Sequence, residues 1–225
     1  MASEKMGELT CVDFWANGYG MRVRIALQEM QIGFSYIEED FRNQETSKLV
    51  LDMNPVYQFT PILLHHGRPI CLSKNILEYI DEVWGGQAGR ASLLPSDPLK
   101  RAHQRFWGDY VDQKIFDTQT RFLKSKGDDK VAIKKELINH FKRLEDVLGD
   151  STFFGGDEFG FLDVVIIPYS SMFHGYEQHG GFDFKEECPK LMCWVERCRG
   201  RDSVQTVLPD DEEMYDLHKK WYGIE

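Results

Sequence analysis

Residues 13–24 carry the side chains of this chain that are best suited to chemistry. The apolar residues 9–12 before them predict a buried strand, and apolar residues at helical spacing follow them. Asn17 and Gly18, in between, tolerate a tight turn. A helix N-terminus at this turn would offer free N–H groups and partial positive charge to a thiolate or carboxylate. Tyr19 adds a proton donor there. The same pattern also fits an ordinary strand-to-helix turn.

The stretch resembles the start of a plant tau-class glutathione transferase, and further matches follow in the right order along nearly the whole chain. The matching segments are DFW at 13–15, GMRVRIAL at 20–27, EED at 38–40, MNPV at 53–56, PIC at 69–71, YIDEVW at 79–84, LLPSDP at 93–98, RFW at 105–107, FGGD at 154–157 and ECPK at 187–190. The resemblance implies a glutathione-transferase fold, a cytoplasmic location and a homodimer.

Composition narrows the classes of partner. The net charge of −10 argues against nucleic acid and against an anionic membrane surface. Residues 1–7 lack the apolar core of a signal peptide, and no apolar run is long enough to span a membrane. The five cysteines, an odd number, indicate free thiols in a reducing compartment. They lack zinc-site spacing, and His65 and His66 beside Gly67 are expected to end a strand, so we predict no metal site.

The first part of the chain mixes strand and helix signals. We expect strands at 9–15, 34–37, 62–64 and 69–71, with helices at 21–30, within 45–53 and at 73–83, the last capped by Ser73. This βαβαββα order is that of a thioredoxin-like domain, which we assign to residues 7–84. By resemblance, the Thr60–Pro61 bond is expected to be cis.

A glycine- and proline-rich linker at 85–98 is followed by an all-helical domain at 99–225. Helices are predicted at 99–124, 129–148, 164–176, 191–198 and 212–221. Gly160 and Asp163 fit the start of the third, with Asp163 in a structural role as a capping-box residue. Residues 164–176 are apolar on nearly all sides, so this helix is expected to form the buried centre of the domain.

The family's glutathione-binding positions are largely substituted here. By resemblance, Asn17 occupies the position of the serine that donates to the thiol. Gln44 and Phe59 replace two lysines that hold the glycine carboxylate, and Leu72 replaces the glutamate of a Glu-Ser pair. Two elements of the glutathione site remain, namely the backbone of Thr60 beside Pro61 and the side chain of Ser73. A hydrogen bond to a charged group contributes about 1.5–3 kcal/mol, so three such losses could cost roughly 4 kcal/mol, about a thousandfold in affinity.

These substitutions favour a less polar ligand in the interdomain cleft. We name Tyr19 and Asn17 as catalytic candidates. The apolar pocket is expected to be lined by Tyr19, Phe116, Thr120, Leu123, Met172, His174 and Tyr176. The main hypothesis is that the chain binds an apolar plant small molecule, with no cofactor required, and catalyses its glutathione-independent isomerisation, elimination or cyclisation. The alternatives are a glutathione transferase with weakened glutathione affinity, in which Arg42, Lys48 or Lys74 restore binding, and a non-catalytic carrier of plant metabolites.

Overall fold

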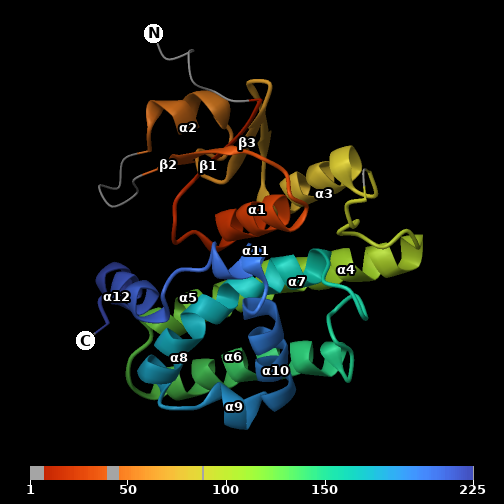
Figure 1. The fold of residues 1–225 in the computed structure, drawn as a ribbon. Coiled ribbons are helices and arrows are strands. Elements are labelled where there is room, and N and C mark those ends of the chain that lie inside the picture. Colours follow the sequence, from red (N-terminus) through yellow and green to blue (C-terminus); the bar gives the residue numbers. More distant parts are fainter. Residues whose placement is uncertain (1–7, 40–45, 88, 225) are drawn as a thin grey trace. The chain divides into compact units, whose positions relative to one another are not determined.

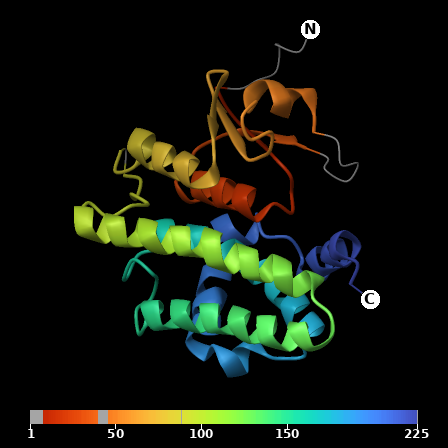
Figure 2. The same ribbon diagram turned by 180° about the vertical axis from the view of Figure 1, so that it is seen from behind.

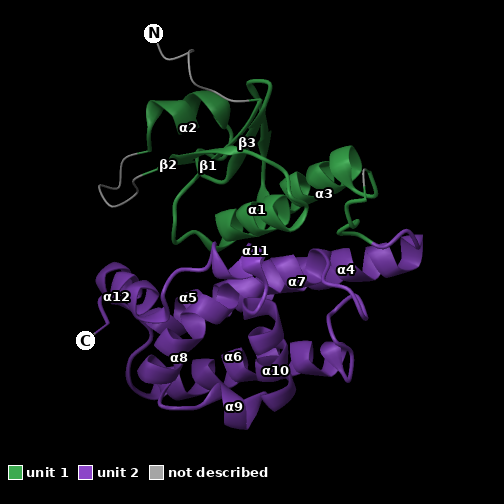
Figure 3. Ribbon diagram, in the orientation of Figure 1, with its two compact units in different colours: residues 1–94 green, residues 95–225 purple. Residues whose placement is uncertain are grey.

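The computed structural model describes residues 8–39, 46–87 and 89–224. The chain divides into two compact units, Met1–Leu94 and Pro95–Glu225 (Figure 3). The division falls within the linker predicted at 85–98. The first unit contains the sheet, and the second is built from helices. Within the described residues, no helix is both long enough and apolar enough to cross a membrane.

The first unit contains a four-stranded sheet in the order β2-β1-β3-β4. The strands are β1 (Leu9–Asp13), β2 (Ser35–Glu38), β3 (Ile62–His65) and β4 (Arg68–Cys71). The helices are α1 (Gly18–Glu29), α2 (Lys48–Met53) and α3 (Ser73–Trp84). β1 pairs parallel with β2 and antiparallel with β3, and β3 and β4 form an antiparallel hairpin. The predicted βαβαββα order is confirmed.

Helices cover both faces of this sheet (Figure 1). Val12, Ile62 and Leu64 form a buried cluster with Val50 of α2 on one face. Side chains alternate along a strand, so the buried Cys11 and its cross-strand partner in β3 point to the other face, where α1 and α3 pack together. Every residue of β1 and the first three residues of β3 are buried, as expected of strands that are covered on both faces.

The topology gathers three chain segments at one edge of the sheet. The antiparallel register pairs Val12 near the end of β1 with Ile62 at the start of β3, and Ile62 with Cys71 at the end of β4. The turn into α1, the segment before β3 and the turn into α3 therefore all leave the sheet at this edge. They carry Asn17, Thr60 and Leu72 respectively.

The second unit is built from α4 (Pro98–Tyr110), η2 (Val111–Ile115), α5 (Phe116–Lys124), α6 (Gly127–Leu148), α7 (Phe161–Ile166), η3 (Ile167–Met172), α8 (Phe173–Gly180), α9 (Phe184–Glu187), α10 (Pro189–Arg199), α11 (Asp202–Gln205) and α12 (Asp211–Tyr222). The helix predicted at 99–124 is one continuous rod with a π-helical turn, η2, in its middle, and it lies alongside α6 (Figure 2). The segment predicted as the buried centre runs through α7, η3 and α8, and every residue of α7 and η3 is buried.

Two local predictions have clear outcomes. The structural role of Asp163 is confirmed, because its carboxylate accepts hydrogen bonds from the N–H groups of Gly160 and Phe154, both at 3.0 Å, and from Trp194 Nε1 at 2.8 Å. The prediction that Ser73 caps α3 is wrong. Ser73 is the first helical residue, and the cap position is Leu72, which provides no side-chain hydrogen bond. The left-handed backbone of Leu72 starts the helix one residue earlier than the serine pattern suggested.

Candidate functional site

Asn17 fixes the turn between β1 and α1. It is the N-cap of α1, and its Oδ1 accepts a hydrogen bond from the Tyr19 N–H at 3.1 Å. Its Nδ2 lies 2.9 Å from Asp13 Oδ1 and 3.3 Å from both the carbonyl and the hydroxyl oxygen of Thr60. The amide hydrogens of Asn17 therefore already have acceptors within the chain, and the contacts with Thr60 are long.

Asp13 is the acceptor at the centre of this turn, and its side chain is fully buried. Burial raises the pKa of the Asp13 carboxyl from 3.8 to about 7, against the opposing effects of Arg24, the Phe14 N–H and Asn17. Arg24 Nε lies 3.3 Å from Asp13 Oδ2. A Cβ built on Gly20 would lie 1.7 Å from the same oxygen, so the carboxylate occupies space that only glycine leaves free.

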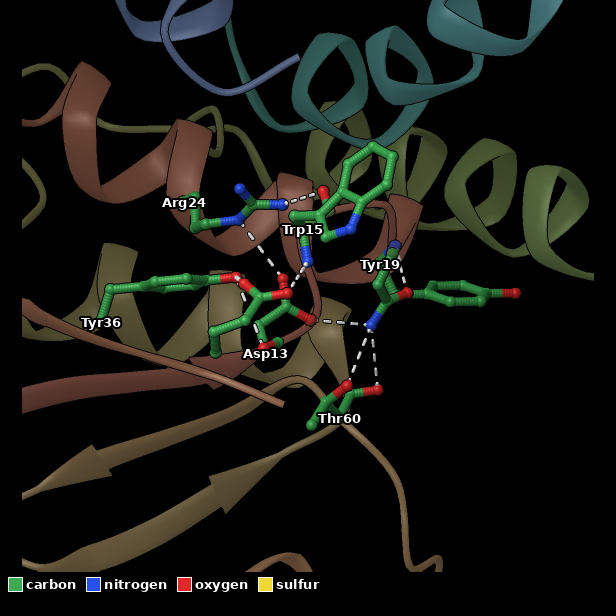
Figure 4. Close-up of polar contacts among 8 residues, drawn as sticks. Asp13, Trp15, Tyr19, Arg24, Tyr36 and Thr60 are labelled. Atoms are coloured by element: carbon green, nitrogen blue, oxygen red, sulfur yellow. Dashed lines mark hydrogen bonds and ion pairs between the residues drawn. The ribbon is translucent and has the colours of Figure 1, made fainter. Parts of the chain in front are cut away.

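Arg24 joins this acid to the edge of the sheet (Figure 4). Its Nη2 donates to the Trp15 carbonyl at 2.8 Å, and its guanidinium lies 5.5 Å from the centre of the Tyr36 ring. Tyr36 donates to Glu38 Oε2 at 2.5 Å, and Glu38 Oε1 accepts from the Trp15 N–H at 3.0 Å. Residues 13–17 are thus held by β2 as well as by α1.

Tyr19 lies in the first turn of α1, and its ring points away from Asp13 (Figure 4). The Arg22 guanidinium lies 4.8 Å from the centre of this ring. Arg22 is itself buried and donates to the Ser73 hydroxyl at 3.3 Å. The retained serine of the predicted Glu-Ser pair therefore links α3 to α1.

The segment before β3 presents the Thr60 backbone. The Thr60–Pro61 bond is cis, as expected. Buried Asn54 shapes the preceding loop by accepting from the Tyr57 N–H at 3.2 Å and donating to the Phe59 carbonyl at 2.8 Å. Among the described residues, the Thr60 N–H has no hydrogen-bond partner.

Two positions predicted to be substituted in the glutathione site lie in the described part of the chain, and both are apolar and open to solvent. Phe59 is 45% exposed and Leu72 is 41% exposed. Leu72 has a φ of 71°, a left-handed conformation that costs a non-glycine residue about 1–3 kcal/mol and that recurs at functional sites. The surrounding fold imposes this conformation, because leucine itself disfavours it. Gln44 lies outside the described residues, as does Arg42, one of the predicted substitutes.

The residues predicted to line an apolar pocket in the second unit divide into a buried group and a more exposed group. Tyr176 is fully buried, and its hydroxyl donates to Gln119 Oε1 and lies 3.2 Å from Met172 Sδ. Leu123 and Met172 are also buried, whereas Phe116 is 40% exposed and accepts at its carbonyl from the Thr120 hydroxyl at 2.9 Å. His174 is half-buried and meets the ring of Tyr215 edge to face, with centroids 5.8 Å apart.

The supporting role of Asp13, Arg24 and Tyr36 is not predicted from the sequence, in which Asp13 and Arg24 only mark the limits of a motif. A charged residue at the end of a buried strand is the one signal that the sequence offers, but it does not reveal which way the carboxylate points.

Two family models match the chain: the glutathione S-transferase N-terminal domain at residues 7–82 and its C-terminal domain at residues 109–197. The chain belongs to the glutathione S-transferase family. Glutathione S-transferase 3 of Glycine max is 49% identical over 210 residues, covering 93% of this chain and 94% of the relative. Glutathione S-transferase U25 of Arabidopsis thaliana is 45% identical over 222 residues, covering 97% and 98%.

Solved structures of this family have the same fold. Rice GST1, crystallised in complex with glutathione, superposes with a TM-score of 0.90 at 39% identity, covering 97% of this chain and all of that one. A tau-class glutathione S-transferase from mango, Mangifera indica, superposes with a TM-score of 0.88 at 30% identity, covering 95% and 98%. These relatives place the chain with the plant tau-class transferases.

Proposed function

We propose that this chain is a glutathione transferase with weakened affinity for glutathione, which conjugates glutathione to small apolar electrophiles. The observation that carries the proposal is the N–H of Thr60, for which the described part of the chain offers no hydrogen-bond partner. In the family, the backbone at this position pairs with the cysteinyl unit of glutathione. This N–H therefore supports a site that still accepts a peptide-like ligand. The name of the rice neighbour, a complex with glutathione, points the same way.

Asn17 is the donor that we assign to the thiolate. Its amide contacts with Thr60, at 3.3 Å, are at the long end of the hydrogen-bond range, so exchanging one of them for a thiolate costs little. The positive end of the α1 dipole would assist, since the position opens a helix N-terminus. Tyr19, in the same turn, is the residue that we assign to the electrophile.

The weak affinity follows from Phe59 and Leu72. Neither side chain can pair with a charged end of glutathione, and each lost charged hydrogen bond contributes about 1.5–3 kcal/mol. The two positions together predict a loss of roughly 3 kcal/mol or more, about a hundredfold in affinity.

Calorimetric titration of glutathione up to millimolar concentration, with conjugation of a generic electrophile as a second readout, tests the proposal. We expect weak binding by the natural chain and about tenfold tighter binding in each of Leu72→Glu and Phe59→Lys. Leu51→Glu on α2 and Val131→Lys on α6 place the same charges on other exposed apolar residues and should change nothing. Absence of both binding and conjugation by the natural chain would overturn the proposal.

A second candidate is activity towards, or carriage of, an apolar plant small molecule without glutathione. The specific observation in its favour is the exposed aromatic pair Tyr57 and Phe59, whose ring centroids are 5.7 Å apart, next to the Thr60 backbone. Under this candidate no cofactor is required, and Tyr19→Phe and Asn17→Ala should impair isomerisation, elimination or cyclisation of the substrate. Ligands recovered unaltered after tight binding would favour the carrier, and unchanged turnover in both variants would refute the catalytic roles.

We further infer, from the family resemblance, that the chain is a cytoplasmic homodimer without a nucleic-acid or membrane partner. Sedimentation velocity of the purified protein checks the dimer, and imaging of a fluorescent fusion in plant cells checks the location.

A further inference from the structure

The register of the sheet brings together three side chains from distant parts of the sequence. β1 and β3 pair with Leu9 opposite His65, so Glu8 lies opposite His66. The His66 N–H donates to the Glu8 carbonyl at 2.8 Å, and His66 Nε2 lies 3.4 Å from Glu8 Oε1. From the sequence, the two histidines are expected only to end a strand, because their third neighbour, Glu8, comes from the opposite strand.

The two imidazoles share one side of the β3–β4 turn. Consecutive residues of a strand point to opposite faces, but His66 has a left-handed backbone with a φ of 50°. This turn lays its ring against that of His65, with centroids 4.5 Å apart and planes inclined by 19°. Both imidazoles therefore lie next to each other on the same side of the turn.

His65 is oriented from behind by α3. Its Nδ1 lies 2.5 Å from the Tyr79 hydroxyl, and its ring lies 5.2 Å from that of Trp84. When Nδ1–H donates to Tyr79, the lone pair of Nε2 is left free. A histidine that binds a metal typically coordinates the ion through one ring nitrogen, while the N–H of the other nitrogen is held by a hydrogen bond.

We propose that Glu8, His65 and His66 form a binding site for a divalent transition-metal ion such as Zn²⁺. The three donor atoms lie within 4.8 Å of one another. A tetrahedral zinc ion with bonds of about 2.0–2.1 Å needs its donors roughly 3.4 Å apart. The exposed side chains of Glu8 and His66 can close this difference. Two imidazoles and a carboxylate suit zinc, and three protein ligands leave a position for water.

Calorimetric titration of the full chain with Zn²⁺ tests this site. We expect the natural chain to bind one equivalent of Zn²⁺ at Glu8, His65 and His66. The affinity for Zn²⁺ should be at least tenfold lower in His66→Asn and in Glu8→Gln. Asparagine tolerates the left-handed backbone at position 66, so the variant keeps the turn. His103→Asn, at an exposed histidine of α4, is the matched control and should bind as the natural chain does.

Tyr79→Phe tests the arrangement of the site independently. Loss of a hydrogen bond that orients a ligating histidine typically lowers metal affinity 10–100-fold, and we expect a reduction in this range. Electron paramagnetic resonance of bound Cu²⁺ should report two nitrogen ligands in the natural chain and one in His66→Asn. Zinc binding that is unchanged in His66→Asn and Glu8→Gln would assign the ion to other groups, such as the exposed Cys193, and would overturn the proposal.

Discussion

Asp13 should make the protein less stable as the pH rises, the opposite of a surface carboxylate in an ion pair. The pKa of its carboxyl rises from 3.8 in the unfolded chain to about 7 in the folded one, because burial outweighs the attraction of Arg24. Between these values the folded state binds the proton more tightly. Asp13 therefore contributes stability below pH 4 that is lost as the pH passes 7, and at 1.36 kcal/mol per pH unit the loss is about 4 kcal/mol.

The comparison of the natural chain with Asp13→Asn isolates this contribution. Urea titrations between pH 4 and pH 8.5 give the free energy of unfolding of each protein. The value for the natural chain minus the value for Asp13→Asn should fall by several kcal/mol as the pH rises across this range. The carboxyl ¹³C resonance missing from the spectrum of Asp13→Asn should titrate near pH 7. In Arg24→Gln it should titrate higher, since the opposing cation is gone. A midpoint below pH 5 in the natural chain would refute the reasoning, because Arg24 would then outweigh burial.

Three further substitutions have definite expected outcomes. Gly20→Ala should lower stability by about 2 kcal/mol or more, as measured by urea unfolding, since the new Cβ would overlap the Asp13 carboxylate. Asp163→Asn should cost about 2–4 kcal/mol in the same assay, because an amide cannot accept at both oxygen positions, and near-ultraviolet circular dichroism should report a loosened Trp194. Arg121→Gln should cost less than about 1 kcal/mol and lose its effect in high salt, since that ion pair is exposed. A salt-independent loss would contradict this last expectation.

The elements of the first unit were predictable because their signals are local. Residues 9–12 and 62–64 are apolar runs of strand length, and the turn at Asn17 uses a residue that caps helices. The capping role of Asp163 was likewise predictable, because Asp163 follows Gly160 at the three-residue spacing of a capping box. The prediction that Ser73 caps α3 is wrong because the helix begins after Leu72, which has a left-handed backbone. A leucine in the sequence gives no sign of that conformation.

Side-chain contacts across the sheet could not be predicted from local sequence. The pairing of Glu8 with His66 depends on the register of β1 and β3, and a shift of one residue would separate them. The inward direction of Asp13 depends on the space that Gly20 leaves in the neighbouring helix. The two short helices α9 and α11 have too few residues for an apolar period to show.

The backbone at Leu72 also bears on how such sequences diverge. The hairpin and α3 impose its left-handed conformation, and the side chain is half in solvent, outside the apolar core. The residue type at this position is therefore free of the packing constraints that govern Val12 or Ile62. A change there between a charged and an apolar side chain would alter the exposed surface at the start of α3 without disturbing the sheet. Under the proposed function, the charge at this position could therefore change while the architecture around it stays the same.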